Sequence, residues 1–196
     1  MLTTTLSFEN LHNHGELFAN MLRARRDLFI VHNKWNLPEA LGMEYDQYDT
    51  PASRWVVVHD ELGRVLAGNR LTPSTARCGI YSYMIRDAQR GLLDTIPSHL
   101  LYDEAPVGEN VWESSRLFVS HDVPAARRRR VHARLVLALT KAARDLGATN
   151  CLTLLNANWP RWAGRVGVDM TAMGPVMEIE GVANQVVSMN FVPNLH

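Results

Sequence analysis

Hydrophobic residues near the start of the chain recur every three or four positions. The repeating residues are Leu17, Phe18, Met21, Leu22, Leu28 and Phe29. This spacing predicts an amphipathic helix from about Glu9 to His32, because residues three and four apart share one helix face. A second series of the same period follows Pro124 and consists of Val131, Leu135, Ala138, Leu139 and Ala142. It predicts a long helix that begins at this proline and ends before Gly147.

Between the two helices, β-branched runs predict a hairpin. Arg54–His59 is typical of a strand, Asp60–Gly63 of a turn and Arg64–Leu71 of the returning strand. Three later strands are predicted at Asn110–Ser120, 149–155 and Gln185–Val192. The segment 158–167, NWPRWAGRVG, favours a short helix that a glycine ends.

The stretch from Ser74 to Pro106 predicts a mixture of short helices and loops. Its larger apolar residues either cover a pocket or pack in the core, and they are Tyr81, Tyr83, Met84, Leu100 and Leu101. The whole order of elements predicts an α/β fold, a single-domain α-β-α sandwich with a mixed central sheet over residues 1–196. A chain of 196 residues with 46% hydrophobic content suits one domain with a sizeable core.

Composition narrows the classes of partner. The formal net charge at pH 7 is zero, which does not predict binding to nucleic acid or to an anionic membrane. Cys78 and Cys151 lie far apart and form no metal or redox motif, which fits a reducing cytoplasm. The N-terminal segment lacks the features of a signal peptide, and no apolar run is long enough to span a membrane. We therefore expect a cytoplasmic protein with no membrane partner.

The segment from Arg25 to Asp49 has the composition of a site. It holds a cation, two aromatic residues and the three carboxylates of Glu44, Asp46 and Asp49. Arg25 falls on the apolar face of the first predicted helix, where a buried guanidinium needs an acceptor because arginine does not lose its charge. The carboxylates are candidate partners. Alternatively, Arg25 lies at the edge of the apolar face and extends its charged end into solvent.

Several motifs occur in order along the chain. They comprise Arg25, Phe29, Trp35, the ExDxxD spacing of Glu44, Asp46 and Asp49, then Arg70, and finally Glu113 and Arg116 within WESSR. Together they resemble the acyl-homoserine-lactone synthases, the LuxI-type enzymes that make quorum-sensing signals. The order of the predicted elements also resembles the acetyltransferase-like (GNAT-type) fold.

The resemblance implies a two-step reaction. An acyl group passes from a thioester to the amine of S-adenosylmethionine, whose carboxylate then displaces methylthioadenosine and closes the lactone. S-adenosylmethionine is a substrate, and we expect no cofactor and no metal. The implied catalytic residues are Glu113, Arg70, Arg116, Asp46 and Asp49. The implied S-adenosylmethionine-binding residues are Arg25, Phe29 and Trp35.

Glu113 is the candidate general base, acting directly or through a water. It lies in a strand predicted to be buried, where desolvation makes a carboxylate more basic. Alternatively, it forms a structural ion pair with an arginine. Glu113 and Arg116 are three residues apart and would point to opposite faces of a regular strand, so we predict a bulge at Ser114 or Ser115. No GxSxG motif or serine triad accompanies these serines.

Two further sets of residues follow from the resemblance. The acyl chain is expected to contact Ser115, Leu117, Thr153, Leu155, Trp159 and Trp162, although core packing explains these residues equally well. An acidic acyl carrier protein is expected to dock on Arg127, Arg128, Arg129, Arg130 and Arg134. The alternative is that these arginines serve solubility, because the chain has two lysines and uses arginine widely.

Two other functions remain open at this point. One is an acyl-coenzyme A-dependent N-acyltransferase that acts on another amine. A pyrophosphate-binding loop that contains glycines would favour this function. The segment FVSHDVPAARRRRV has no such glycines, so a carrier-protein donor fits better. The other is a non-catalytic homologue, which the full set of charged positions disfavours. The sequence does not give the acyl length, the oxidation state of the third carbon, the donor or the oligomeric state.

Overall fold

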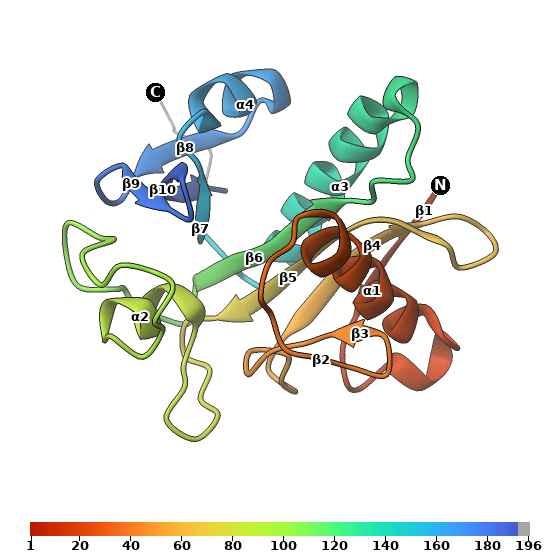
Figure 1. Ribbon diagram of the computed structural model, residues 1–196, viewed down its shortest axis with the longest axis horizontal. Helices are drawn as coiled ribbons and strands as arrows, with labels where there is room; N and C mark the ends of the chain where they lie inside the picture. Colours follow the sequence, from red (N-terminus) through yellow and green to blue (C-terminus); the bar gives the residue numbers. More distant parts are fainter. Residues whose placement is uncertain (192–196) are drawn as a thin grey trace. The chain divides into compact units, whose positions relative to one another are not determined.

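The computed structural model describes residues 1–191, and the chain divides into two units (Figure 1). The first unit contains Met1–Leu71 and Arg116–Ala142, and the second contains Thr72–Ser115 and the residues from Ala143 onward. Strand β6 (Val111–Val119) and helix α3 (Ala125–Asp145) contribute residues to both units.

The first unit is a mainly antiparallel sheet with a helical segment packed on it. Its strands are β1 (Leu2–Leu6), β4 (Arg54–His59), β5 (Val65–Pro73) and the end of β6, which are neighbours in that order. The β1–β4 and β4–β5 pairs are antiparallel, with Leu6 opposite Trp55 and Trp55 opposite Arg70. A separate small hairpin pairs β2 (Glu39–Ala40) with β3 (Met43–Glu44).

The first predicted helix is wrong in extent. A 3₁₀ turn, η1 (Leu11–Asn13), comes first, and α1 (Leu17–Arg26) begins only after Gly15. Gly15 has φ of +53°, which a helix interior does not contain and which glycine adopts at little cost. The last six residues of the predicted helix form a π-helix, η2 (Asp27–His32). The apolar face is nevertheless where the spacing places it, because Leu17, Met21, Leu22 and Phe29 are buried.

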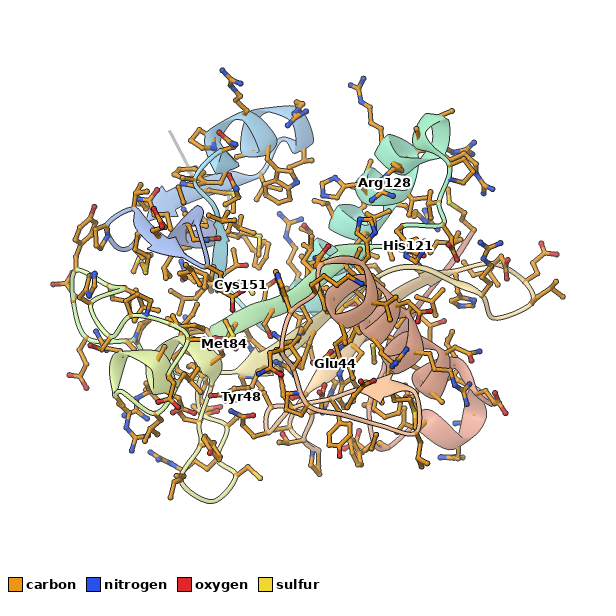
Figure 2. The ribbon with its side chains drawn as sticks, in the orientation of Figure 1. Glu44, Tyr48, Met84, His121, Arg128 and Cys151 are labelled. Atoms are coloured by element: carbon orange, nitrogen blue, oxygen red, sulfur yellow. The ribbon has the colours of Figure 1, made fainter. Side chains whose placement is uncertain are left out.

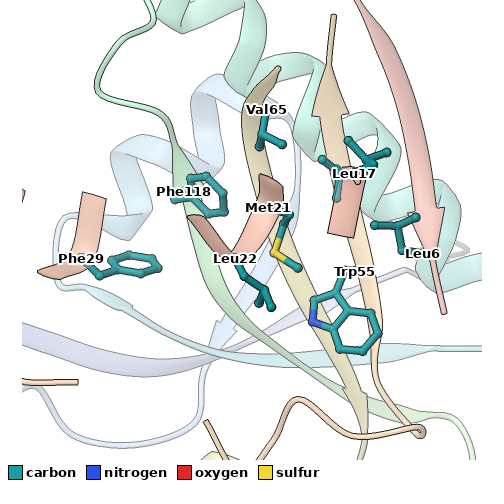
Figure 3. Packing of buried hydrophobic residues seen from close by; sticks show 9 residues of the cluster. Leu6, Leu17, Met21, Leu22, Phe29, Trp55, Val65 and Phe118 are labelled. Carbon is teal, nitrogen blue, oxygen red and sulfur yellow. The ribbon is translucent and has the colours of Figure 1, made fainter. Parts of the chain in front are cut away.

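These buried residues form the core of the first unit (Figure 3). The core consists of Leu6, Leu17, Met21, Leu22, Phe29, Trp55, Val57, Val65 and Phe118. Gly68 on β5 leaves space for the ring of Phe118, since an added Cβ would lie 2.7 Å from that ring. The core therefore joins α1 and η2 to strands β1, β4, β5 and β6.

The second unit is built on a mixed sheet. Its strands are the start of β6, β7 (Asn150–Asn156), β10 (Val182–Asn190), β8 (Asp169–Ala172) and β9 (Met177–Ile179). β6 and β7 are parallel from Val111 opposite Asn150 to Ser114 opposite Thr153. β10 pairs antiparallel with β7, β8 and β9.

Two short helices belong to the second unit, α2 (Met84–Gln89) and α4 (Trp159–Val166). α4 has Pro160 in its first turn and ends at Gly167, whose φ is +67°. This matches the predicted short helix. The core contains Tyr83, Ile85, Ala88, Leu100, Leu101, Ala105, Leu152, Met177 and Val186. Tyr83, Leu100 and Leu101, for which pocket and core roles were left open, are therefore core residues.

The predicted strands and the long helix occur close to their expected bounds. The last strand begins at Val182, earlier than predicted, and Val192 lies outside the described residues. Strands β1, β2, β3, β8 and β9 were not predicted.

Candidate active site

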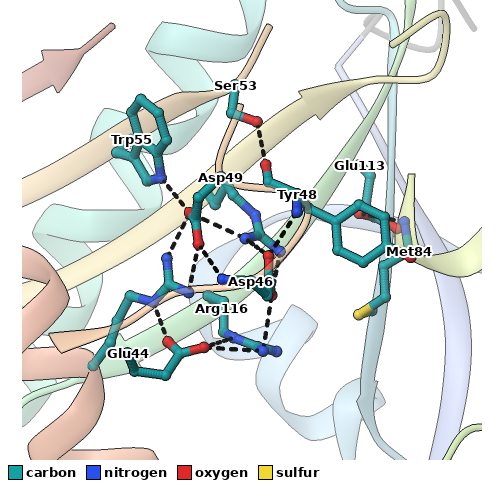
Figure 4. Close-up of polar contacts among 11 residues, drawn as sticks. Glu44, Asp46, Tyr48, Asp49, Ser53, Trp55, Met84, Glu113 and Arg116 are labelled. Carbon is teal, nitrogen blue, oxygen red and sulfur yellow. Dashed lines mark hydrogen bonds and ion pairs between the residues drawn. The ribbon is translucent and has the colours of Figure 1, made fainter. Parts of the chain in front are cut away.

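Six charged residues of the first unit form one network, which we call the charge cluster (Figure 4). They are Arg25, Glu44, Asp46, Asp49, Arg70 and Arg116. Arg25 comes from the end of α1, the carboxylates from β3 and the loop after it, Arg70 from β5 and Arg116 from β6. Three guanidinium groups therefore meet three carboxylates.

Arg25 is held by two of the carboxylates. Its Nε donates to Glu44 at 2.5 Å, and its Nη1 and Nη2 donate to the two oxygens of Asp49 at 2.8 and 3.0 Å. Arg25 is 1% exposed. The alternative of an arginine extended into solvent is therefore wrong, and the expectation of a buried guanidinium with acidic partners is confirmed.

Arg70 binds Asp46 and shares Asp49 with Arg25. Its Nη1 and Nη2 donate to Asp46 at 2.5 and 3.2 Å, and Nη1 lies 3.1 Å from Asp49. Asp49 also accepts the indole N–H of Trp55 at 2.9 Å and the backbone N–H of Asp46 at 2.9 Å. The loop that carries the carboxylates is thus fixed to β4 and β5.

Arg116 completes the cluster from β6. Its Nε and Nη2 lie 3.1 Å from Glu44, and Nη2 lies 2.9 Å from Asp46. Its side chain is 13% exposed, more than that of Arg25 or Arg70. The backbone of Arg116 has φ of +52°, a departure from regular strand geometry directly after the two serines where we predicted a bulge. The bulge itself stays a prediction.

Glu44 belongs to the charge cluster but is absent from the predicted catalytic and substrate-binding residues. It is fully buried and accepts hydrogen bonds from both Arg25 and Arg116. Its place in the ExDxxD spacing was a signal for a role in this site.

The charges of the cluster shift the acidity of its members. Burial alone raises the pKa of Asp49, but Arg70 and Arg25 lower it more, so its pKa lies well below the usual range. Burial likewise raises the pKa of Asp46, and Arg70 and Arg116 outweigh it, which leaves that pKa lowered too. Burial lowers the pKa of Arg25, but Asp49 and Glu44 raise it by more, so the pKa lies above its ordinary value. All of these shifts favour the ionised network.

An aromatic pair lies beside the cluster. Phe29 and Trp35 stack with ring centroids 5.1 Å apart and an interplanar angle of 5°. The guanidinium of Arg116 lies over the Phe29 ring at 5.7 Å. Phe29 is buried, whereas Trp35 is 40% exposed. Trp35 therefore presents an aromatic surface to solvent next to a group of charges.

Glu113 has a different environment, in the second unit. Its carboxylate lies beside Met84 at the start of α2 (Figure 4). It accepts the backbone N–H of Met84 at 3.2 Å and that of Ile85 at 2.8 Å. Glu113 is fully buried. The two N–H bonds stabilise the ionised carboxylate. The start of α2 is therefore one partner of this carboxylate.

Five of the six predicted acyl-pocket residues belong to the second unit, and Leu117 belongs to the first. Thr153 is buried opposite Ser114, and Leu155 lies opposite Gln185 of β10. The indole N–H of Trp159 donates to that glutamine side chain at 2.7 Å. A role in binding an acyl chain stays a prediction for this set.

The arginines of α3 divide into two kinds. Arg128 donates to the backbone carbonyls of Val119, Ser120 and His121, so its charge fixes the loop before the helix (Figure 2). The other arginines of the predicted docking set are exposed, namely Arg127, Arg129, Arg130 and Arg134, and Arg144 near the end of the helix donates to the carbonyl of Phe191.

Two kinds of feature are absent from residues 1–191. No group of three or more His, Cys, Asp or Glu residues is arranged to hold a metal ion. None of the helices in this part of the chain combines the length and the apolar character that crossing a membrane requires.

Solved structures share this fold. The acyl-homoserine-lactone synthase BjaI superposes with a TM-score of 0.80 at 21% identity, covering 98% of this chain and 84% of that one. An acyl-CoA N-acyltransferase from Pseudomonas aeruginosa superposes with a TM-score of 0.60 at 18% identity, covering 96% and 99%. The predicted GNAT-type α/β fold is confirmed.

Sequence comparison then gives the family. A synthase of Ralstonia solanacearum is 30% identical over 167 residues, which cover 83% of this chain and 76% of the relative. One from Vibrio anguillarum is 29% identical over 105 residues, which cover 54% and 48%. Both are named acyl-homoserine-lactone synthase. The family model for autoinducer synthases matches residues 9–193, and the chain belongs to this family of acyltransferases.

Proposed function

We propose that this protein is an acyl-homoserine-lactone synthase that uses an acyl-carrier-protein thioester and S-adenosylmethionine. It transfers the acyl group to the amine of S-adenosylmethionine, and lactone closure then releases methylthioadenosine. The observation that carries the proposal is the charge cluster with its neighbouring aromatic pair, because it brings together the residues of the family pattern other than Glu113. BjaI, which shares the fold, was solved with SAM and isopentyl-CoA, which supports the choice of S-adenosylmethionine.

The aromatic pair and Arg116 suit the two charged ends of S-adenosylmethionine. An exposed tryptophan ring attracts a cation such as the sulfonium, and Trp35 offers such a ring. Arg116 is the least buried arginine of the cluster, so it is the member best suited to bind the substrate carboxylate. Arg25, Arg70, Asp46 and Asp49 then hold the shape of the site through their mutual ion pairs.

Glu113 is the proposed general base for the amine, directly or through one water. Its two bonds from α2 hold the carboxylate in one orientation, which a general base requires. Lactone closure asks less of the protein, because the sulfonium leaves readily and the attack is intramolecular. Positioning of the substrate is sufficient for this second step.

A carrier protein is the proposed acyl donor because the start of α3 is poorly suited to a pyrophosphate. The backbone N–H groups of Arg127 and Arg128 already donate to the carbonyl of Pro124, and the Arg128 guanidinium is bound to loop carbonyls. The turn also lacks glycines, which let a backbone approach a pyrophosphate closely. The exposed arginines of α3 instead suit a docking surface for an acidic protein.

A coenzyme A thioester is the second candidate donor, since BjaI is described as CoA-dependent. An N-acyltransferase acting on another amine is the second candidate function, and the likeness to the P. aeruginosa enzyme favours it. That function gives no reason for the charge cluster.

The test combines purified protein, S-adenosylmethionine and a panel of acyl-carrier-protein and acyl-coenzyme A thioesters. Methylthioadenosine and acyl-homoserine lactones are followed by mass spectrometry. We expect lactone with carrier-protein donors and a large loss of rate for Glu113→Gln. Because Glu113 also holds the start of α2, thermal unfolding and S-adenosylmethionine binding of the variant must be measured beside its rate. Acylation of some other amine without any lactone would contradict the proposal.

A further inference from the structure

One buried donor of the second unit has no partner. The indole Nε1 of Trp112 is enclosed, and within residues 1–191 it is the buried side-chain nitrogen or oxygen that lacks a hydrogen bond. Trp112 is 7% exposed. An unmade hydrogen bond to a buried donor is costly, so such a group usually has a water or a ligand as its acceptor.

The strand register shows which face of the sheet carries this donor. Side chains alternate along β6, so Trp112 and Ser114 share one face and Glu113 points to the other. The face of Glu113 is the one that α2 covers, as its bonds to Met84 and Ile85 show. The Trp112 indole therefore lies on the sheet face opposite α2.

The same face carries residues of the predicted acyl pocket. Thr153 lies opposite Ser114, and Leu155 follows two positions later on β7. The β6–β7 pairing ends at Ser114 and Thr153, one side-chain repeat beyond Trp112. An acyl group bound along Thr153 and Leu155 would therefore lie on the same sheet face as the indole.

We propose that Trp112 is a specificity-determining residue whose indole N–H donates to an oxygen on the third carbon of the acyl group. This inference rests on the proposed synthase function. A donor that already lacks an acceptor gains a hydrogen bond from a 3-oxo or 3-hydroxy chain and gains none from a plain alkyl chain. Sites of this kind discriminate more strongly than apolar pockets, which distinguish similar chains weakly. Trp112 thus favours oxygenated acyl donors.

The test compares octanoyl, 3-hydroxyoctanoyl and 3-oxooctanoyl donors with wild type and Trp112→Phe. Phenylalanine keeps an aromatic ring and removes the N–H. We expect kcat/KM for the oxygenated donors to fall about tenfold in the variant, while that for octanoyl changes little. The control is Tyr83→Phe, which removes the hydroxyl of a core residue that already donates to the carbonyl of Pro106 at 2.6 Å. Its ratio of oxygenated to plain donor should equal that of wild type.

A second readout does not depend on turnover. In protein labelled with ¹⁵N at tryptophan, the Trp112 Nε1–H resonance is identified by its absence from Trp112→Phe. The probes are ketone analogues of 3-oxooctanoyl- and octanoyl-pantetheine with a methylene between the carbonyl and the sulfur. We expect a downfield shift with the oxygenated analogue alone. Thermal unfolding shows whether both variants are folded.

The outcomes separate the two proposals. If lactone forms and Trp112→Phe leaves the donor ratio unchanged, the role of Trp112 is overturned and the synthase function stands. If the resonance does not move, a bound water or empty space accompanies the indole and the inference is overturned. If no donor yields lactone, the synthase function fails, and the resonance alone then decides whether Trp112 recognises an oxygenated acyl group.

Discussion

Asp49 connects its own loop to three other elements of the first unit, namely α1, β4 and β5. It accepts hydrogen bonds from Arg25 and Trp55 side chains and from the backbone of Asp46, and it lies 3.1 Å from Arg70. Asp49→Asn removes the charge and keeps the size. We expect a loss of about 3–5 kcal/mol in the free energy of unfolding, because two buried arginines lose a counter-charge. Urea unfolding at pH 7 measures it.

The free energy of unfolding of wild type and of Asp49→Asn, measured as a function of pH, tests whether the charge of Asp49 causes this loss. The pKa of Asp49 is lower in the folded protein than its ordinary value of 3.8, because the arginines outweigh the effect of burial. Such a group stabilises the fold above its unfolded pKa, and that contribution is lost as pH falls toward the folded pKa. The difference between wild type and Asp49→Asn should therefore stay constant down to about pH 4 and shrink below it. A difference that grows on acidification would contradict this account.

Arg116 combines an unfavourable backbone with favourable ion pairs. Its φ of +52° is a conformation that costs an L-residue about 1 kcal/mol and costs glycine little. Arg116→Ala and Arg116→Gly both remove the contacts with Glu44 and Asp46. We expect the glycine variant to be the more stable of the two by about 1 kcal/mol in urea unfolding. In a regular strand the order would be reversed, so an alanine variant of equal or greater stability would argue against the left-handed conformation.

At the scale of elements, a close approach in the second unit limits one position to glycine. A Cβ added to Gly174 would lie 1.9 Å from the carbonyl oxygen of Leu100. The neighbouring backbone is paired there, since the N–H of Tyr102 donates to the carbonyl of Met173. We therefore expect Gly174→Ala to lower the thermal midpoint clearly, because the backbone itself must move.

Gly164 provides the matched control within α4. Nothing lies within 4 Å of its added Cβ, and alanine is the better helix former by about 1 kcal/mol. Gly164→Ala should raise the thermal midpoint slightly. If both alanine variants behaved alike, the close approach at Gly174 would not be a constraint in solution.

Helix α3 carries the proposed docking surface on one face. Arg127, Arg130 and Arg134 recur at helical spacing, and Leu137 continues the series while remaining 67% exposed. We expect Arg130→Glu with Arg134→Glu to raise KM for carrier-protein donors at least severalfold and to leave acyl-pantetheine donors unaffected. The exposed Arg77→Glu serves as the charge-matched control. An equal loss with both kinds of donor would place the effect elsewhere.

At the scale of the whole molecule, zero net charge conceals an uneven distribution. Residues 125–141 carry six arginines and lysines and no acidic residue, although the complete chain is neutral with an isoelectric point near 7.1. A local basic surface binds polyanions even when the total charge is zero. We expect weak retention on a cation-exchange resin at pH 7 and low salt, which Arg130→Glu with Arg134→Glu abolishes. Absence of retention by wild type would mean that nearby acidic groups mask the helix.

Most of the regular elements were predicted because their patterns are clear. In α3 the apolar residues recur at helical spacing, and β4 is a run of β-branched residues. It did not predict β1, whose Thr3, Thr4 and Thr5 have no alternation of apolar and polar residues. The break at Gly15 was missed because helical spacing continues on both sides of it. Of the candidate site, the acidic partners of Arg25 were predicted, since a buried guanidinium requires them. The bonds between Glu113 and α2 were not, because no local pattern connects residues so far apart in the chain.

The charge cluster also bears on how this family can change its sequence. An arginine or a carboxylate replaced alone leaves a buried charge without its counterpart, whereas exchange of both partners together can be nearly neutral. Divergence at these six positions therefore requires simultaneous substitutions, which arise far more rarely than single ones. We expect these six residues to stay unchanged while surface residues are substituted. The family pattern should then be recognisable in relatives that share less than a third of their residues.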